Sequence, residues 1–312
     1  MEVGNRTVLT EFILLGFSAN PQMQLILFGL FLLLYLATMC GNMTLVVLIL
    51  IDSRLHTPMY FFIGNLSFLD FWYTSVYSLR ILFTCLSKDK RLSIPGCAAQ
   101  FFFSCMAVYT ECYLLTSMSY DRYVAICSPL LYSAKMSSSL CSGLVIGSYI
   151  GGILNGIAHT TNTFRMSFCG DNTIDHFFCD VLPLIKKVCT DTRAYVKIIA
   201  ILDAITVTSC LLPILISYLN ILVAILRIRS ASGRRKAFST FASHLVSVTF
   251  FFGSLLFMYS NPGSTTHPES NKVGSLFYTL INPLLNPVIY SMRNKDVKEA
   301  FKKAIQTIRP QS

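Results

Sequence analysis

The sequence predicts an all-α membrane protein, a bundle of seven transmembrane helices followed by a short amphipathic C-terminal helix. Only 13% of the 312 residues are charged, whereas an ordinary soluble domain has about 25%. Hydrophobic residues make up 54%, which also excludes intrinsic disorder. Seven mostly apolar stretches each reach the length of about 20 residues that a helix needs to cross the hydrocarbon core. A typical soluble globular protein is therefore excluded.

Each predicted span should be a helix, because backbone groups cannot stay unpaired in lipid. A single acidic residue interrupts the second, third and fifth spans, as Asp70, Glu111 and Asp203 respectively. There is no linker or internal repeat, so we expect one domain over 1–312. The predicted segments are an extracellular tail at 1–24, spans at about 25–51, 58–79, 98–120, 140–162, 198–226, 237–259 and 273–292, and a cytoplasmic amphipathic helix and tail at 293–312.

The distribution of Lys and Arg predicts which way the chain crosses the membrane. If the N-terminus is outside, the cytoplasmic segments hold 14 basic residues and the outer segments 11. The bias is strongest in the loop Arg227 to Lys236, with five basic residues in ten, as the positive-inside rule expects. The sequon Asn5-Arg6-Thr7 would then be an extracellular glycosylation site. This use of the basic residues leaves no support for nucleic-acid binding.

Four of the 11 cysteines lie in the predicted outer segments, an oxidising compartment that favours two disulfides. Spacing alone leaves all three pairings open. A bridge from Cys97 into the long loop at 163–197 would fold that loop over the bundle as a lid. His176, Cys179 and Asp180 could instead bind a metal, but a disulfide at Cys179 is favoured, and we expect no metal. The seven other cysteines should be small buried apolar residues, at positions 40, 85, 105, 112, 127, 141 and 210.

Ionisable side chains inside a membrane are costly and usually face the bundle interior. Asp70 and Glu111 could hold a cation such as Na⁺ between them, or one carboxyl could stay protonated beside the other. A purely structural hydrogen-bonded network is an equal alternative. Asp203 lies where a cavity open to the outside would reach, and could recognise a polar or cationic group. Pairing with His159 or with a loop Lys is the favoured alternative for Asp203.

Seven motifs occur in one order along the chain: EFILLGF at 11–17, GN at 41–42, LHTPMY at 55–60, MSYDRYVAIC at 118–127, SY at 217–218, KAFSTFASH at 236–244 and PLLNPVIYSMRN at 283–294. With these motifs the chain resembles an olfactory receptor of the rhodopsin-like (class A) G-protein-coupled receptor family, nearly from end to end. The short third outer loop resembles the tetrapod type, class II.

Two of the motifs have a direct physical interpretation. Asp121 lies beside Arg122, so a carboxylate can hold or release an always-charged guanidinium. Pro287 removes a backbone hydrogen bond and permits a kink in the seventh span, with Asn286 and Tyr290 on one face of it. The resemblance implies a G-protein switch made of Asp121, Arg122, Tyr123, Tyr218, Asn286, Pro287 and Tyr290.

The resemblance also implies a function. A small organic odorant would bind in the outer half of the bundle, the sixth span would move outward, and the stimulatory olfactory G protein would raise cyclic AMP. It implies the disulfides Cys97–Cys179 and Cys169–Cys189, an ion site at Asp70 and Glu111, and a location in the plasma membrane of olfactory cilia. The implied ligand-binding residues are Ser104, Cys105, Val108, Tyr109, Leu202, Asp203, Thr206, Phe252, Leu255, Tyr259 and Thr279.

The chain departs from the family pattern at two places in the sixth span. The family usually has FYG where this chain has Phe251-Phe252-Gly253, so a hydroxyl of the activation network is missing, which bears on basal activity and coupling. Phe241 replaces the commoner Cys, which we interpret as a packing change.

Beyond the seventh span, apolar residues recur every three or four positions over 294–308. We expect this helix to lie on the inner leaflet and to contact anionic lipid.

A transporter or light-driven ion pump that uses Asp70 and Glu111 as an ion relay is the rival hypothesis. The seventh span has no Lys that could form a retinal Schiff base, and no inverted repeat occurs, so the sequence disfavours it. An enzyme is less favoured still, because no nucleophile elbow or metalloprotease motif is present.

Overall fold

The computed structural model describes residues 9–17, 20–87, 89–259, 272, 274–292 and 295–308. Within these ranges, the side chains at 236, 239, 240, 259, 292, 307 and 308 are not described. The predicted glycosylation site Asn5 and the side chain of Tyr259 therefore lie outside the described part of the chain.

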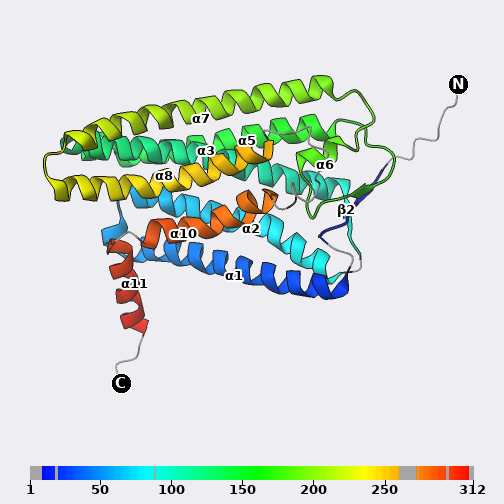
Figure 1. Cartoon of the computed structure of the whole chain (residues 1–312), viewed down its shortest axis with the longest axis horizontal. Helices are drawn as coiled ribbons and strands as arrows, with labels where there is room; N and C mark the ends of the chain where they lie inside the picture. The colour runs from blue at the N-terminus through cyan, green and yellow to red at the C-terminus, as the bar shows by residue number, and fades with distance from the viewer. Residues whose placement is uncertain are drawn as a thin grey trace.

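Long helices running side by side form the body of the molecule (Figure 1). Short helical turns lie between or beside the long helices, and the helix α11 (Lys295–Ile308) follows the last long helix in the chain. The long helices are α1 (Pro21–Ile51), α2 (Pro58–Leu86), α3 (Ile94–Cys127), α5 (Ser138–Phe164), α7 (Arg193–Arg227), α8 (Ala231–Tyr259) and the pair η3 (Phe277–Ile281) and α10 (Asn282–Met292). The short turns are η1 (Ser53–Leu55), η2 (Pro129–Leu131), α4 (Tyr132–Lys135) and α6 (Val181–Ile185).

Local sequence explains where several of these helices begin. Proline occupies the first turn of α1, α2 and α3, where its missing N–H has no partner to lose. The side chain of Asn20 accepts a hydrogen bond from the N–H of Gln22, and Ser137 caps α5 by accepting from Leu140. These caps satisfy backbone donors that have no partner inside the helix.

Five described helices are long and apolar enough to cross a membrane: α1, α3, α5, α7 and the part of α8 at Phe241–Met258. The two remaining predicted spans are also helical where the structure describes them. The range 58–79 lies within α2, and 274–292 includes η3 and α10. Val273 lies outside the described residues. Length and composition thus identify five of the seven predicted spans.

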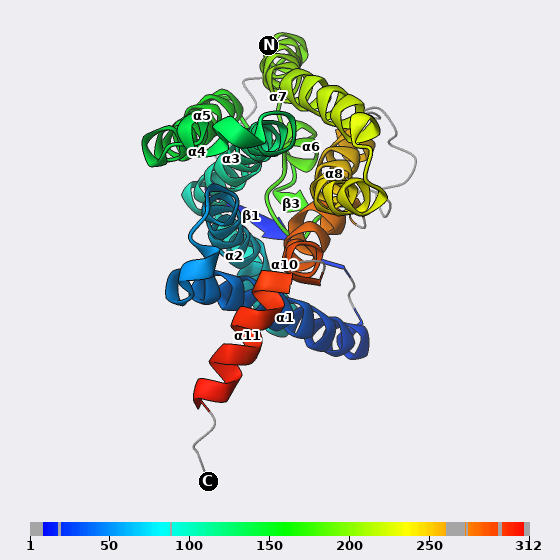
Figure 2. The same cartoon turned by 90° about the vertical axis from the view of Figure 1, so that its left-hand side faces the viewer.

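The helices pack around α3, which contacts α2, α5, α7 and α8. Figure 2 shows this arrangement along the bundle, with α2, α5 and α7 next to α3. Large apolar side chains such as Leu33, Leu50 and Leu226 lie on the outside and are at least 66% exposed. A bundle with exposed apolar side chains on several helices has the surface expected of a protein that faces lipid.

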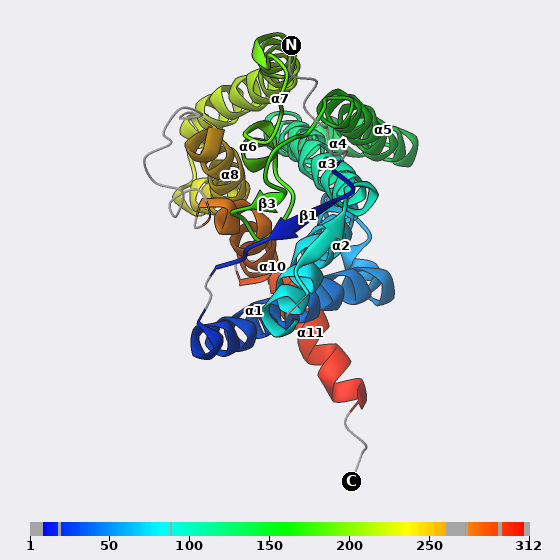
Figure 3. The same cartoon turned by 90° about the vertical axis from the view of Figure 1, so that its right-hand side faces the viewer.

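A small sheet covers one end of the bundle, and the sequence did not predict it. It consists of β1 (Glu11–Leu14), β2 (Arg91–Ser93) and β3 (Thr173–Ile174), in the order β2-β1-β3. The strand β1 pairs antiparallel with β2, where Phe12 faces Leu92, and parallel with β3. Figure 3 looks onto this end, which we call the sheet end, and shows β1 lying across the helices.

The helix α11 lies at the opposite end of the bundle, which we call the α11 end, and runs across the direction of the long helices (Figure 1). It occupies the stretch in which the sequence predicts an amphipathic helix. Val297 and Ala300 are buried, whereas Lys298 and Lys302 are exposed. One face of α11 therefore packs against the protein and a charged face points away from it.

Candidate functional site

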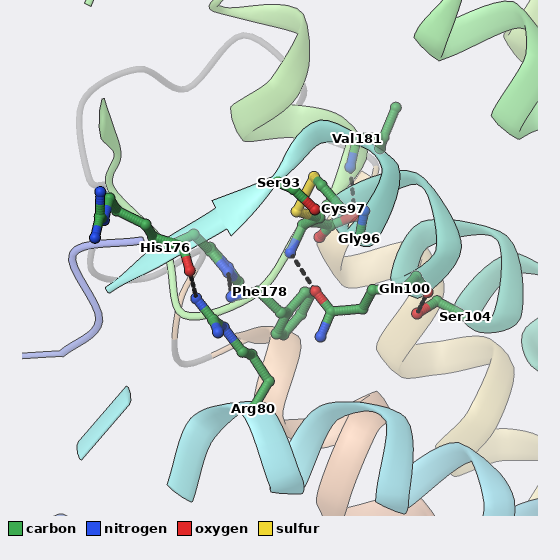
Figure 4. The surroundings of a disulfide bond; sticks show 12 residues. Arg80, Ser93, Gly96, Cys97, Gln100, Ser104, His176, Phe178 and Val181 are labelled. Atoms are coloured by element: carbon green, nitrogen blue, oxygen red, sulfur yellow. Dashed lines mark hydrogen bonds between the residues drawn. A yellow bond between two sulfur atoms is a disulfide. The ribbon is translucent and has the colours of Figure 1, made fainter. Parts of the chain in front are cut away.

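A lid built from the long loop after α5 covers the sheet end. Disulfides join Cys97 to Cys179 and Cys169 to Cys189, so the predicted pairing is confirmed. The backbone N–H of Cys179 donates to Oε1 of Gln100 on α3 at 3.0 Å (Figure 4). Because Cys179 is in a disulfide it cannot be a metal-binding thiolate. Among the described residues, no group of three or more His, Cys, Asp and Glu side chains could hold a metal ion.

The seven other cysteines are free, but one prediction about them is wrong. Cys40 on α1 is exposed rather than buried. Its position is compatible with the apolar outer surface of α1, because a thiol behaves as a small apolar group. Cys112, Cys141 and Cys210 are buried as predicted, and the remaining three are partly buried.

The lid is also tied to the start of the seventh helical segment by polar contacts. The Tyr278 hydroxyl donates to Oδ2 of Asp180 at 3.0 Å, and the Lys272 ammonium lies 2.6 Å from Oδ1 of Asp175. His176 is 4% exposed between them. Its burial, with a smaller contribution from the Lys272 charge, lowers the pKa of His176 to about 3. The lid thus carries a neutral, buried imidazole.

Below the lid, three helices bring polar side chains of the predicted ligand set together. Tyr109 of α3 donates its hydroxyl proton to Oδ1 of Asp203 of α7. The same hydroxyl lies 2.7 Å from Nε2 of His159 of α5, and that nitrogen lies 3.4 Å from Oδ1 of Asp203. Asp203 therefore pairs with His159, as one of the two predictions had it, while no loop Lys forms an ion pair with it among the described residues.

The other predicted ligand residues differ in accessibility. The Ser104 hydroxyl donates to the carbonyl oxygen of Gln100, and the Thr279 hydroxyl to that of Ser275, so both are satisfied within their own helices. Thr206 donates to Oδ1 of Asn155 at 3.3 Å. Phe252 is buried in the main core, and Cys105, Val108, Leu202 and Leu255 are partly buried. Sequence reasoning did not identify Asn155, because an amide in a helix has no distinguishing pattern.

Two pockets occur elsewhere in the described structure, and neither is lined by the predicted ligand residues. One lies at the sheet end between α1, α2 and Phe177. The other lies at the α11 end and is lined by Met59, Met118, Asp121, Arg122, His244 and Tyr290. The second pocket contains three residues of the predicted switch.

The two predicted ion-site acids lie in the middle of the bundle. Asp70 is fully buried and Glu111 is 2% exposed, and the two carboxyl groups are close enough to interact electrostatically. Asn286 donates its amide to Oδ2 of Asp70 at 2.8 Å, and its own Oδ1 accepts the Ser247 hydroxyl at 2.8 Å. One switch residue is therefore hydrogen-bonded directly to one ion-site acid.

At the α11 end the predicted switch is held by reversible polar contacts. The Arg122 guanidinium pairs with Asp121, and the Tyr132 hydroxyl donates to the other oxygen of Asp121 at 2.7 Å. Tyr218 of α7 lies 2.7 Å from Nδ1 of His244 of α8. Pro287 lies inside α10, while Tyr123 is partly buried and Tyr290 is buried. Tyr132 lies outside the seven motifs and His244 ends one of them, but only the fold shows that both contact the switch.

Comparisons with known proteins identify the family of the chain. A model of the olfactory receptor family matches residues 31–307. The chain belongs to the olfactory receptor family. The receptor is 70% identical over 312 residues to Olfactory receptor 9G4 of Homo sapiens, covering 100% of this chain and 95% of that protein. It is 53% identical over 306 residues to Olfactory receptor 9G19 of Mus musculus, covering 98% of this chain and 100% of that protein.

Family membership settles the broad class of the molecule. The receptor is a membrane protein of the rhodopsin-like G-protein-coupled receptor class, and it is not an enzyme. Receptors of this family bind odorants and act through G proteins.

Proposed function

We propose that the receptor crosses the plasma membrane seven times, binds a small organic odorant between α3, α5, α7 and α8, and activates a stimulatory olfactory G protein that raises cyclic AMP. One observation carries the proposal. The helix α3 holds both Tyr109, in the polar cluster below the lid, and Arg122, in the switch. At about 1.5 Å per residue they lie roughly 20 Å apart along one rigid element, so α3 can couple the two sites.

The contacts of α8 suggest how ligand binding changes the α11 end. Tyr218 with His244 joins α7 to α8, and Ser247 with Asn286 joins α8 to α10. An outward movement of the α11 end of α8 breaks one or both contacts and widens the pocket around Arg122. A ligand drives this change only by the difference in its affinity for the two arrangements.

The sheet end is the extracellular end in this proposal. It carries both disulfides, which form and persist outside the cell. The five basic residues between Arg227 and Lys236 then lie in the cytoplasm, as does α11. Exposed Phe301 and Ile305, with exposed lysines beside them, suit α11 to the surface of an anionic inner leaflet. Glycosylation at Asn5 and a location in olfactory cilia belong to the same proposal.

A sodium ion between Asp70 and Glu111 is a further part of the proposal. The residues fit such an ion, because Oδ1 of Asp70 and Oε1 of Glu111 are buried without a hydrogen-bond partner in the described structure. Carboxylate oxygens are ligands for hard cations. A bound ion would supply positive charge between the two acids, while Asn286 holds the other oxygen of Asp70.

Cyclic AMP in cells that express the receptor tests the function. Cells are exposed to a broad odorant panel, with the Arg122→Ala variant as the control and surface expression measured in intact cells through an N-terminal epitope tag. We expect at least one odorant to raise cyclic AMP in the receptor and not in the variant. Silence to the whole panel, with the tag detected at the surface, counts against the proposed function. A tag detected only after permeabilisation counts against the proposed orientation.

A further inference from the structure

One acidic side chain in the bundle is accessible. Asp70, Glu111 and Asp121 of α2 and α3 are at most 2% exposed. The side chain of Asp203, the only acidic residue of α7, is 44% exposed. A charged group at this depth is costly unless it meets water or a partner, so its exposed part marks a place where a ligand gains from contact.

The contacts around Asp203 are all made to one carboxylate oxygen, Oδ1, and leave the other oxygen without a partner among the described residues. Tyr109 donates to Oδ1, and the contact with His159 is made to the same Oδ1. Within the described part of the chain, Oδ2 has neither a hydrogen-bond partner nor an ion-pair partner. Tyr109 and His159 therefore fix the orientation of the carboxylate and leave Oδ2 free to accept a hydrogen bond from a ligand.

Proton positions leave the cluster with a negative charge. The Tyr109 hydroxyl has one proton, which it gives to Asp203, so its oxygen accepts the Nε2–H of His159. A neutral imidazole protonated at Nε2 is sufficient for this arrangement. No Lys or Arg forms an ion pair with Asp203 among the residues that the structure describes. The cluster of Asp203, Tyr109 and His159 thus presents one uncompensated carboxylate.

A cation with N–H donors complements this site better than a neutral molecule does. A hydrogen bond with an ionised donor or acceptor is about twice as strong as one between neutral groups, and an ammonium adds a Coulomb attraction to the carboxylate that a neutral donor lacks. The residues of the ligand set near the cluster in sequence, Val108 and Leu202, are apolar and partly buried, so the remainder of the ligand should be apolar as well.

We propose that the receptor's ligands are small protonated alkylamines whose ammonium group donates to Oδ2 of Asp203. This inference rests on the proposed function and specifies the ligand class of the same site. Tyr109 and His159 act as positioning residues, because both contact Oδ1 of Asp203 and so hold the carboxylate in place.

Matched ligands and variants test the inference. The probes are butylamine, hexylamine and octylamine, each compared with the primary alcohol of the same chain length, which has the same shape but no charge. We expect each amine to be at least tenfold more potent than its alcohol in raising cyclic AMP. Asp203→Asn should remove this preference, because it removes the charge of the carboxylate. Asp191→Asn, which neutralises an exposed acid of the loop just before α7, is the control and should keep the preference.

A second readout does not depend on the G protein. Purified receptor should unfold at a higher temperature with hexylamine than with hexan-1-ol, and Asp203→Asn should abolish the difference. Tyr109→Phe should weaken the amine effect without removing it. A receptor that responds to neutral odorants but shows no amine preference in either assay overturns the amine inference and leaves the proposed function standing. An amine-specific thermal shift without any signalling supports the amine site and counts against the proposed function.

Discussion

The two ends of the bundle are held together by different chemistry. At the sheet end, two disulfides, a three-stranded sheet and the Tyr278–Asp180 contact fix the lid. At the α11 end, the switch is held by the Asp121–Arg122 pair and by single hydrogen bonds such as that between Tyr218 and His244. Covalent bonds do not exchange during signalling, whereas polar contacts can break and reform. This difference suits the sheet end to the stable ligand site that we propose, and the α11 end to the proposed rearrangement.

Removing the central disulfide should have the largest effect. The variant Cys97→Ser with Cys179→Ser should lose about 2–5 kcal/mol of stability, the usual cost of losing a native disulfide. We expect a lower unfolding temperature of the purified receptor and less receptor at the cell surface. Cys40→Ser changes an exposed free thiol and is the control. Equal surface levels and unfolding temperatures for the two proteins would contradict the assigned role of the disulfide.

Breaking the buried hydrogen bonds that join Ser247, Asn286 and Asp70 should have the second-largest effect. Asn286→Ala leaves Oδ2 of Asp70 and the Ser247 hydroxyl without their partners. Each buried unsatisfied group costs about 1–3 kcal/mol, so thermal unfolding should occur at a lower temperature and signalling should fall. Asn220→Ala is the control, because the Asn220 side chain is exposed and bonds only to its own helix. If both variants unfold at the same temperature, the hydrogen bonds of Asn286 contribute nothing to stability.

The buried histidine of the lid should make stability depend on pH. His176 has a pKa of about 3 in the folded receptor, against an unperturbed value of 6.5. Below pH 6.5 the unfolded chain binds a proton that the folded chain does not bind, so stability falls as the pH decreases toward 3. Between pH 6.5 and 5 the loss is about 1.6 kcal/mol, because the slope reaches its limit of about 1.4 kcal/mol per pH unit only well below pH 6.5. Thermal unfolding at the two pH values measures this loss, which should be absent in His176→Gln. An equal loss of stability in the receptor and in the variant would mean that another group causes it.

Loosening the switch should raise basal activity rather than lower stability. Asp121→Asn keeps the hydrogen bond from Tyr132 but removes the charge that holds Arg122. We expect basal cyclic AMP to rise at least about fivefold, because allosteric coupling energies begin at about 1 kcal/mol. Tyr132→Phe removes only a neutral donor and should give a smaller rise. A larger rise in Tyr132→Phe than in Asp121→Asn would contradict the prediction that the Asp121–Arg122 ion pair restrains the switch more than the Tyr132–Asp121 hydrogen bond does.

The smallest effect should come from restoring a family hydroxyl. Phe252→Tyr adds one possible hydrogen bond in the buried part of α8. Basal and agonist-driven cyclic AMP should rise about two- to fivefold, since a single hydrogen bond contributes about 0.5–1 kcal/mol. Phe251→Tyr adds the same group one position earlier and should give no rise. Unchanged signalling in Phe252→Tyr would show that the missing hydroxyl does not limit this receptor.

Much of the helical architecture follows from the sequence alone. A stretch such as 25–51 has no charge, and an uncharged stretch of that length in a membrane chain has few alternatives to a helix. The first six predicted spans lie within observed helices, and the seventh is helical over its described residues, 274–292. However, α2 extends beyond its predicted end to Leu86, and α3 begins earlier, at Ile94. Arg80 comes directly after the predicted end of the second span, but one charged side chain does not end a helix, so hydropathy alone places such ends poorly.

The sheet and the polar partners depended on tertiary structure. The strands are two to four residues long, too short to show a clear alternation, and they exist because distant segments meet at one end of the bundle. Asp203 and its neighbours illustrate the same point, because Tyr109, His159 and Asp203 come from three helices that only packing brings together.

The sequence by itself determined that this chain is a helical membrane protein, and its motifs determined the receptor family. Both depend on local properties: apolar length sets whether a segment crosses lipid, and a short motif can be recognised without its surroundings. Only the tertiary structure decided which hydroxyl reaches which carboxylate and which oxygen of Asp203 remains free. Hydrogen bonds require partners within about 3 Å in a defined direction, and residues far apart in the chain meet that requirement only after the helices have packed.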